Sequence, residues 1–321
     1  MTRPSPDGRQ LAERLRERDL SVAPAVLNLL ENRTGQSRSQ ADDLLAAVSP
    51  AALGGETPGH VVGLTGPPGV GKSTLLSRLI SAWRADGRSV AVLAVDPTSK
   101  RSGGALLADR ARMDVDAGDR AVFIRSTAAG GRLGGLAPAT RAAAAALSAA
   151  FDVVVIETVG VGQSETEVAD VADTVVVVVQ PASGDVLQFL KAGIMEVPDV
   201  LVVTKADLGQ VASRSVADLQ TALRTLDARS AEVLAVSAVP PATGIAELVD
   251  GLDRHRAGLD LARRRTRARR MHALADFAAE HGERGLRALS GRREAERWLS
   301  AQAPGLDVPA LTRALEERAG R

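Results

Sequence analysis

Eight residues near position 70 have the spacing of a phosphate-binding loop, G-x-x-x-x-G-K-[ST]. Glycines let backbone N–H groups wrap around phosphates, and the start of a following helix adds positive potential. The lysine would reach the β- and γ-phosphates, and the serine hydroxyl a Mg²⁺ ion. The alternative, a glycine-rich turn with a chance Lys-Ser pair, is disfavoured because a strand-like apolar run precedes the loop and helical spacing follows it. The predicted phosphate-binding residues are Gly66, Pro67, Pro68, Gly69, Val70, Gly71, Lys72 and Ser73.

Lysine is scarce in this chain. Only four lysines occur among the forty Lys and Arg residues. A compact ammonium on a flexible stem is not interchangeable with a guanidinium fork, so a position that keeps lysine is informative. Two of the four, Lys72 and Lys205, fall inside nucleotide motifs. The other two are Lys100 and Lys191.

Acidic residues follow two further apolar runs. Asp96 ends one run and Glu157 ends another, and a carboxylate beside a phosphate loop can hold Mg²⁺ directly or through its water shell. Glu157 is the acid expected near the metal and the attacking water, while Gly160 could donate a backbone N–H to a γ-phosphate. Gln163 could position water or contact a partner. Asp109 follows a glycine pair that suits a mobile γ-phosphate sensor, and an ordinary helix-surface charge is the equal alternative.

Residues 204–207 read Thr-Lys-Ala-Asp and resemble the guanine-recognition motif N-K-x-D. Asp207 can accept hydrogen bonds from guanine N1–H and the exocyclic amine, which adenine cannot supply. Thr204 replaces the usual asparagine and so removes an amide that commonly braces the phosphate loop and reaches the base. We expect Asp207 to preserve the guanine preference, while the replacement could lower the affinity. Ser237 and Ala238, after the last apolar run, match the loop whose backbone N–H faces the guanine oxygen.

Short aliphatic strands alternate with helical segments from residue 60 onward, and each motif above lies just after one of them. Such alternation predicts an α/β fold with a mostly parallel central sheet flanked by helices and ligands at the carboxyl ends of the strands. The expected strands are Val61–Thr65, Val90–Val95, Ala121–Ile124, Val153–Ile156, Thr174–Val179, Val200–Val203 and Val233–Val236.

Helical extensions are predicted on both sides of this domain. Residues 1–59 read as a helical extension and linker, residues 60–255 as the nucleotide-binding domain, and residues 256–321 as a helical arm that would serve dimerisation. The basic run at 263–270 could contact nucleic acid, but the solvated face of a long helix is the favoured interpretation.

The amino-acid composition limits the classes of protein to which this chain can belong. The 321 residues are 45% hydrophobic and only 2% aromatic, so the core must be aliphatic, as parallel sheets prefer. A net charge of +1 gives no pull toward nucleic acid or a membrane surface. With no cysteine, no signal-peptide pattern and no apolar run of about 20 residues, a cytoplasmic location is expected. The four histidines lack metal-ligand spacing.

These motifs together resemble the MeaB/ArgK family of P-loop GTPases. The resemblance covers residues 11–265 and is most specific at 95–99 (V-D-P-T-S), 103–113 and 157–165. It implies a GTP-hydrolysing chaperone of an adenosylcobalamin-dependent acyl-CoA mutase, of the methylmalonyl-CoA mutase type, which gates cofactor loading and protects the mutase. It also implies a homodimer. The tail beyond Arg270 runs longer than the family pattern.

The resemblance also implies a role for each matching residue. Phosphates and Mg²⁺ would be bound by Lys72, Ser73 and Thr74, with Asp96, Asp109 and Glu157 as the metal-side acids. The catalytic group would be Lys72, Asp109, Glu157 and Gly160. The guanine base would be held by Thr204, Lys205, Asp207, Ser237 and Ala238. A switch toward the partner would involve Gln163, Asp185 and Lys191.

Three other functions fit parts of the pattern. A nickel-delivering GTPase would need thiolate or clustered imidazole ligands, which the chain lacks. A P-loop kinase of a small molecule would prefer ATP, against the guanine signature. A nucleotide-gated scaffold would bind GTP without hydrolysis. No arginine finger can be assigned, so slow, partner-stimulated turnover is expected; the candidates are Arg101, Arg110 and Arg112.

Overall fold

The computed structural model divides into two compact units. One comprises His60–Thr140 and Phe151–Leu259, and the other comprises Met1–Gly59, Arg141–Ala150 and Asp260–Arg321. The first unit holds a sheet with its helices, and the second is helical. The structure describes residues 7–32, 34–96, 116, 118–130, 135–158, 164–182, 198–225 and 231–320.

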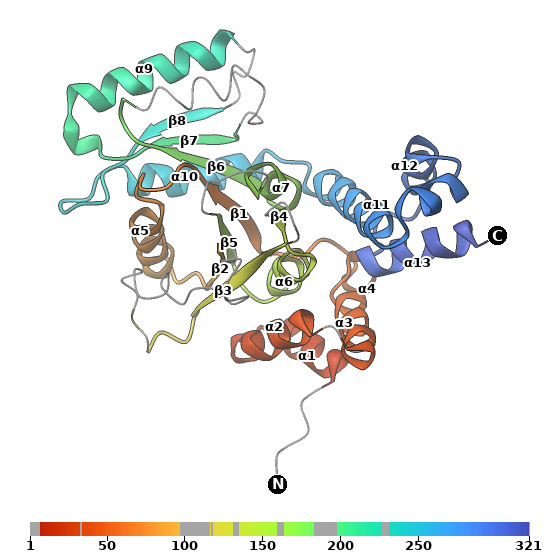
Figure 1. Ribbon diagram of the computed structural model, residues 1–321. Coiled ribbons are helices and arrows are strands. Elements are labelled where there is room, and N and C mark those ends of the chain that lie inside the picture. Colours follow the sequence, from red (N-terminus) through yellow and green to blue (C-terminus); the bar gives the residue numbers. More distant parts are fainter. Residues whose placement is uncertain are drawn as a thin grey trace, which may run out of the picture. The chain divides into compact units, whose positions relative to one another are not determined.

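A sheet of eight strands forms the centre of the first unit. Every neighbouring pair is parallel except the last pair at one edge (Figure 1). This confirms the predicted α/β class and the seven predicted strands, to which the structure adds one two-residue strand. In spatial order the strands are β4 Gly135–Leu136, β3 Val122–Gly130, β2 Val90–Asp96, β5 Val153–Thr158, β1 His60–Thr65, β6 Thr174–Val179, β7 Val200–Val203 and β8 Glu232–Ala235.

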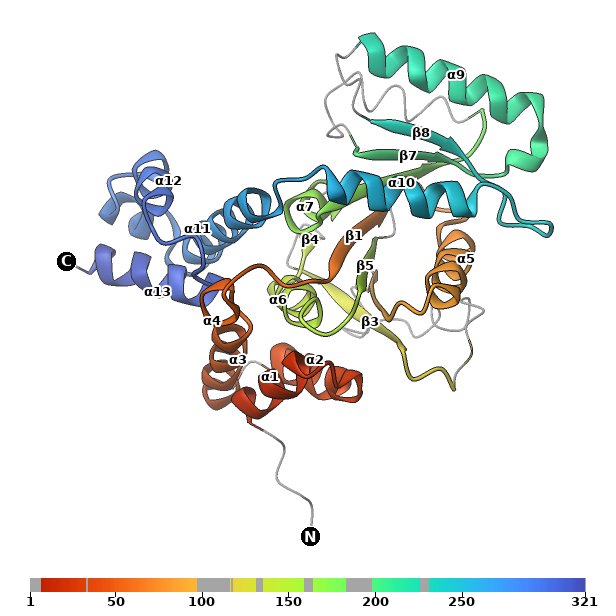
Figure 2. The same cartoon turned by 180° about the vertical axis from the view of Figure 1, so that it is seen from behind.

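The central strands are apolar along their whole length because helices cover both faces of the sheet. Every residue of β1, β5, β6 and β7 is buried, so the sequence reads as continuous aliphatic runs and not as alternating ones. One face packs on α5 and α10, which share a core cluster with the sheet; Figure 2 shows α10 lying across that face. The described helices that lie wholly within this unit are α5 Lys72–Ala85, α7 Ser164–Val171, η3 Ala206–Leu208, α9 Gln210–Thr225 and α10 Ile245–Ala257.

Three aspartates fix the register of the sheet at the amino-terminal ends of its parallel strands. Each stands immediately before a strand, and its carboxylate accepts the backbone N–H at or near the start of a neighbouring strand. A carboxylate acceptor satisfies an N–H that the ladder leaves without a partner, and a one-residue slip would break the bond. The pairs are Asp152 with Ser89, Asp173 with Val61 and Asp199 with Val175, each at 2.8 Å.

A chain of hydrogen bonds runs along the same edge and accounts for two of the four histidines. The Thr174 hydroxyl lies 2.7 Å from His60 Nε2 and 2.8 Å from His255 Nδ1. His255 Nε2 in turn lies 3.2 Å from Asp199 Oδ1. These contacts tie α10 to β1 and β6, so both imidazoles have a structural explanation.

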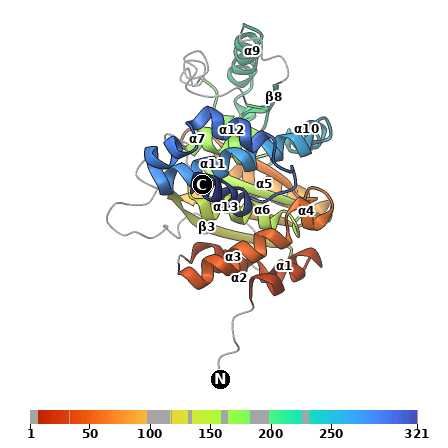
Figure 3. The ribbon, with the colours of Figure 1, turned by 90° about the vertical axis from the view of Figure 1, so that its right-hand side faces the viewer.

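The second unit is a set of packed helices. The helices α11, α12 and α13 share an apolar cluster that includes Phe277 and Leu299, and Figure 3 shows them lying together. Aspartates at 7, 260 and 307 cap three of the helices through their side chains. The elements of this unit are α1 Gly8–Arg16, η1 Leu20–Val22, α2 Ala23–Glu31, α3 Gly35–Ala47, α4 Pro50–Leu53, α11 Leu261–Ala288, α12 Arg292–Ser300 and α13 Val308–Ala319; α6 Pro138–Leu147 contributes from Arg141 onward.

The basic run of α11 is only partly a solvated face. Arg269 forms a bidentate pair with Glu56 at 2.8 and 3.0 Å, and Arg265 donates to the carbonyls of Thr57 and Gly59. The helix thereby holds the segment that leads into β1. Arg263, by contrast, is exposed. The sequence predicted the long helix, but the inward turn of these arginines depends on which segment lies beside it.

The buried side of α11 also perturbs two titratable groups. Burial lowers the pKa of His272 to about 3, and the nearby Arg141 guanidinium adds to that effect. Burial raises the pKa of Asp276, an effect opposed by the ion pair that its carboxylate forms with Arg141 at 2.5 Å. His272 is therefore neutral at physiological pH. Among the described helices, none has a segment apolar and long enough to cross a bilayer.

The aspartate contacts lead to a stability prediction. Asp173→Ala removes the acceptor of the Val61 N–H, and a buried donor left without a partner costs about 1–3 kcal/mol. Urea denaturation should show that loss in the free energy of unfolding. Asp173→Asn keeps an oxygen acceptor and should lose less, and Asp218→Ala on the exposed face of α9 should be near neutral. Equal stabilities for Asp173→Ala and Asp218→Ala would contradict this role.

Candidate functional site

The predicted phosphate-binding loop follows β1 and turns sharply into α5. Gly66 has φ +142°, and a Cβ atom built there would lie 2.1 Å from the carbonyl oxygen of Val178 on β6. Only glycine fits so close to that backbone. Gly69 and Gly71 have φ +78° and +97°, which is the left-handed region that glycine adopts without strain. The glycines of the motif are therefore required by the turn itself.

The loop delivers its lysine to the start of a helix. Lys72 is the first residue of α5, whose N-terminus carries no side-chain cap, so the first N–H groups of the helix remain available for an anion. Its Nζ donates to the carbonyls of Gly66 at 2.7 Å and Pro67 at 2.9 Å. These bonds hold a buried ammonium over the loop, where it would meet a phosphate.

A serine and a glutamate meet beside the loop. The Ser73 hydroxyl donates to Glu157 Oε1 at 3.0 Å, which brings α5 to the end of β5. The adjacent Thr158 and Thr65 hydroxyls bond at 2.8 Å and fasten β5 to β1. A hydroxyl and a carboxylate are hard oxygen donors of the kind that Mg²⁺ prefers, so these residues fit that ion. Asp96 ends β2, the strand on the other side of β5.

Thr204 braces the phosphate loop through its hydroxyl. The side chain is buried, and Oγ1 donates to the carbonyl of Val70 at 2.7 Å and lies 3.0 Å from the carbonyl of Val179. The expectation that loss of asparagine removes this brace is therefore wrong, because a hydroxyl on a β-branched side chain reaches the same loop. Threonine does lack the second polar group of an amide.

The rest of the predicted base-binding motif is held by neighbouring strand ends. Lys205 has φ +55°, a strained conformation for a residue with a side chain, and its Nζ donates to Gln180 Oε1 at 2.7 Å. The Ser237 hydroxyl donates to Asp207 Oδ1 at 2.9 Å. Asp207 is exposed, and Ser237 fixes its direction.

Arg78 is a residue of this region that the sequence motifs did not indicate. It lies on α5, and its Nε donates to the carbonyl of Ala238 at 3.0 Å. The helix that begins at the phosphate loop thus contacts the loop after β8. Arginine is so common in this chain that its presence at one helical position carries no signal by itself.

Several predicted residues lie outside the described part of the chain. These are Asp109, Gly160, Gln163, Asp185 and Lys191, together with the candidate arginines at 101, 110 and 112. The side chain of Asp96 is not described either. Their assigned roles remain predictions.

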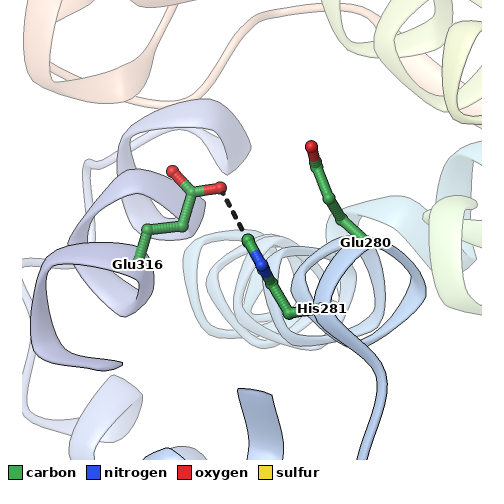
Figure 4. A group of neighbouring side chains, drawn as sticks. All are labelled: Glu280, His281 and Glu316. Carbon is green, nitrogen blue, oxygen red and sulfur yellow. Dashed lines mark hydrogen bonds and ion pairs between the residues drawn. The ribbon is translucent and has the colours of Figure 1, made fainter. Parts of the chain in front are cut away.

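The described residues include another group of possible metal ligands, in the helical unit. Glu280 and His281 on α11 and Glu316 on α13 bring three ligand atoms within 4.8 Å of one another (Figure 4). His281 Nε2 lies 3.2 Å from Glu316 Oε1, and its ring packs on Phe277 at 4.6 Å between centroids. Helix packing explains these contacts, and the group is mostly exposed.

The arrangement as a whole places two kinds of binding group along one edge of the sheet. The ends of β1 and β5 carry backbone donors, an ammonium and hard oxygen ligands, which suit a polyphosphate with a divalent cation. The ends of β7 and β8 carry a directed carboxylate that suits a purine edge with two donors. A ligand that joins these groups is a nucleoside polyphosphate.

Comparison with known proteins agrees with this geometry. Residues 23–287 match the family described as methylmalonyl-CoA mutase-associated GTPase MeaB. A protein from Pyrococcus abyssi named as a GTPase is 42% identical over 269 residues, covering 81% of this chain and 80% of its own length. Another from Pyrococcus horikoshii is 48% identical over 199 residues, and the match covers 62% of this chain and 60% of that protein. A crystal structure titled LAO/AO transport system kinase superposes with a TM-score of 0.64 at 26% identity and covers 97% of both chains.

The close approach at the first glycine leads to a binding prediction. Gly66→Ala should weaken GDP binding by more than about tenfold, because its methyl group would collide with a backbone carbonyl and push the loop outward. Calorimetric titration with Mg²⁺ present measures the affinity. Gly69→Ala is the matched control: it meets nothing within 4 Å and adds only left-handed strain of about 1–2 kcal/mol. A larger loss in Gly69→Ala than in Gly66→Ala would overturn this explanation.

Proposed function

Because this chain belongs to the MeaB family of mutase-associated GTPases, we propose that it binds and hydrolyses GTP with Mg²⁺ and serves as a chaperone of an adenosylcobalamin-dependent acyl-CoA mutase. The observation that carries the nucleotide assignment is the joint presence of the two motifs on one sheet edge. The phosphate loop and Thr204 are hydrogen-bonded to each other, and Asp207 is oriented by Ser237. A single guanine nucleotide can occupy both.

The phosphate end would be bound by the loop amides, the start of α5 and Lys72. Ser73 and Glu157 would hold Mg²⁺, which neutralises the charge that develops on the transferred phosphoryl group. Lys72 would exchange its bonds to the loop carbonyls for bonds to β- and γ-phosphate oxygens. The chain's own contribution is thus a set of donors fixed before the substrate arrives.

Hydrolysis would proceed by in-line attack of water on the γ-phosphorus. The water oxygen forms the new P–O bond, the bond to the β–γ bridging oxygen breaks, and GDP leaves with that oxygen while the water proton passes to phosphate or solvent. Glu157, at the end of β5, would act beside this chemistry, because its carboxylate contacts Ser73. The arginine-finger candidates at 101, 110 and 112 lie outside the described residues, and the expectation of slow turnover by the isolated protein rests on the sequence.

The partner assignment comes from the family. The family name specifies association with methylmalonyl-CoA mutase, and we carry that association to this chain as a mutase partner whose cofactor loading the GTPase gates. A homodimer formed through the carboxyl-terminal helices belongs to the same proposal. One structurally similar protein is titled a transport system kinase; a kinase would select ATP, which Asp207 disfavours.

Base selectivity tests the nucleotide assignment. The wild-type protein should bind GTP far more tightly than ATP. Asp207→Asn should lose about 10- to 100-fold in GTP affinity, the value of hydrogen bonds to a charged group, and gain affinity for xanthosine triphosphate. Fluorescence competition with the three nucleotides measures this. If the wild-type chain preferred ATP, the kinase alternative would take the place of this proposal.

Partner stimulation tests the chaperone assignment. Phosphate release by the isolated protein should be slow, and a cobalamin-dependent acyl-CoA mutase should accelerate it by about tenfold or more, equivalent to ~1.4 kcal/mol of barrier. Lys72→Ala should abolish both rates, which excludes a contaminating phosphatase. Unchanged turnover with the mutase, in a protein that binds GTP selectively, would leave the GTPase assignment standing and remove the partner assignment.

A further inference from the structure

The two loops that would meet the base are each fastened to the phosphate loop or to its helix. The motif after β7 is joined to the loop through Thr204, and the segment after β8 is joined to α5 through Arg78. Both bonds link a side chain to a backbone carbonyl, at 2.7 Å for Val70 and 3.0 Å for Ala238. Thr204 stands at the first position of the base-binding motif, and Arg78 lies outside every motif.

Each bond restrains a different protein group that is expected to meet the guanine base. Thr204 lies immediately before Lys205 and three residues before Asp207, so its anchor sets the distance from the phosphate loop to the carboxylate. Arg78 holds the carbonyl of Ala238. The Ala238 N–H belongs to the preceding peptide unit and is separated from that carbonyl by only two backbone dihedrals, so a bond to the carbonyl restrains the position of the N–H. That N–H is the group expected to face the guanine oxygen.

A third bond closes the circuit between the two loops. Ser237 donates to Asp207 at 2.9 Å, and Ser237 also forms an antiparallel bridge with Thr243. The phosphate loop, α5, the motif after β7 and the loop after β8 are therefore connected in a ring of hydrogen bonds. Because the protein's own side chains hold these loops in place, less of the site must be ordered on binding, and this lowers the cost of binding.

We propose that Thr204 and Arg78 are positioning residues that set the guanine-binding edge at a fixed distance from the phosphate loop and thereby determine base selectivity. The proposal rests on the proposed function, since it requires a guanine nucleotide at this site. Neither residue would touch the reacting atoms. Thr204 acts through the loop backbone and Asp207, and Arg78 acts through the backbone of Ala238.

The test compares base selectivity in variants that lose one donor each. Thr204→Val is isosteric and lacks the hydroxyl, and Arg78→Met keeps an unbranched stem without the guanidinium. Each should lower the ratio of GDP to ADP affinity by about fivefold, the fold-change expected for one net hydrogen bond. Thr204→Ser, which keeps the donor, should restore most of the ratio. Calorimetric titration with GDP and with ADP, in the full chain with Mg²⁺, gives both constants.

Matched controls separate positioning from general destabilisation. Thr221→Val on α9 also removes a hydroxyl bonded to a backbone carbonyl, at 2.8 Å, and Arg224→Leu removes an exposed arginine from the same helix. Both should leave the ratio unchanged. A variant that merely loosens the fold would lower the melting temperature and weaken GDP and ADP alike, with no change in their ratio. Thr204→Ala and Arg78→Gln give the same measurement if a first variant does not fold.

The outcomes are distinguishable from failure of the proposed function. A wild-type chain without preference for GDP over ADP would remove the guanine assignment itself. A wild-type chain with that preference, whose Thr204→Val and Arg78→Met variants keep the full ratio, would overturn the positioning role and leave the guanine assignment intact.

Discussion

The site depends first on how β1 is placed within the parallel sheet. β1 lies between β5 and β6, and the chain leaves it through Gly66, against the backbone of Val178 on β6. There is no room for a side chain at that point, so the loop path is determined by the position of β6. At the opposite end of the strands, Asp173 holds the start of β1. The register of the strands at their amino-terminal ends therefore determines where the phosphate loop lies at their carboxyl-terminal ends.

Hydrogen bonds restrain the conformation of the phosphate loop, which its glycines alone would leave variable. Glycine gives the loop the conformations it needs, but it also leaves the backbone free to adopt others. Lys72 bonds two loop carbonyls from within, and Thr204 bonds a third from β7. A loop restrained in this manner keeps its N–H groups directed without spending binding energy on their alignment.

Thr204 departs from the N-K-x-D motif but still braces the phosphate loop. An amide and a hydroxyl differ in length and in donor number, yet Thr204 is buried and stands close enough to Val70 for one short bond. The contact from Arg78 to Ala238 adds a second connection in a place where the motif has none. The proposed guanine-binding edge is consequently held by side chains from two different elements.

The sequence alone determined the α/β class, the seven strands and the family, because buried parallel strands appear as continuous apolar runs and because a phosphate loop needs glycines at fixed spacing. It could also place Asp207 and Glu157 at strand ends. Only the tertiary structure decided the strand order, the contact of Thr204 with the phosphate loop, the contact of Arg78 with Ala238 and the inward turn of the arginines on α11. These depend on which segments become neighbours in space, and hydrogen bonds between residues distant in the chain leave no periodic pattern in the sequence that forms them.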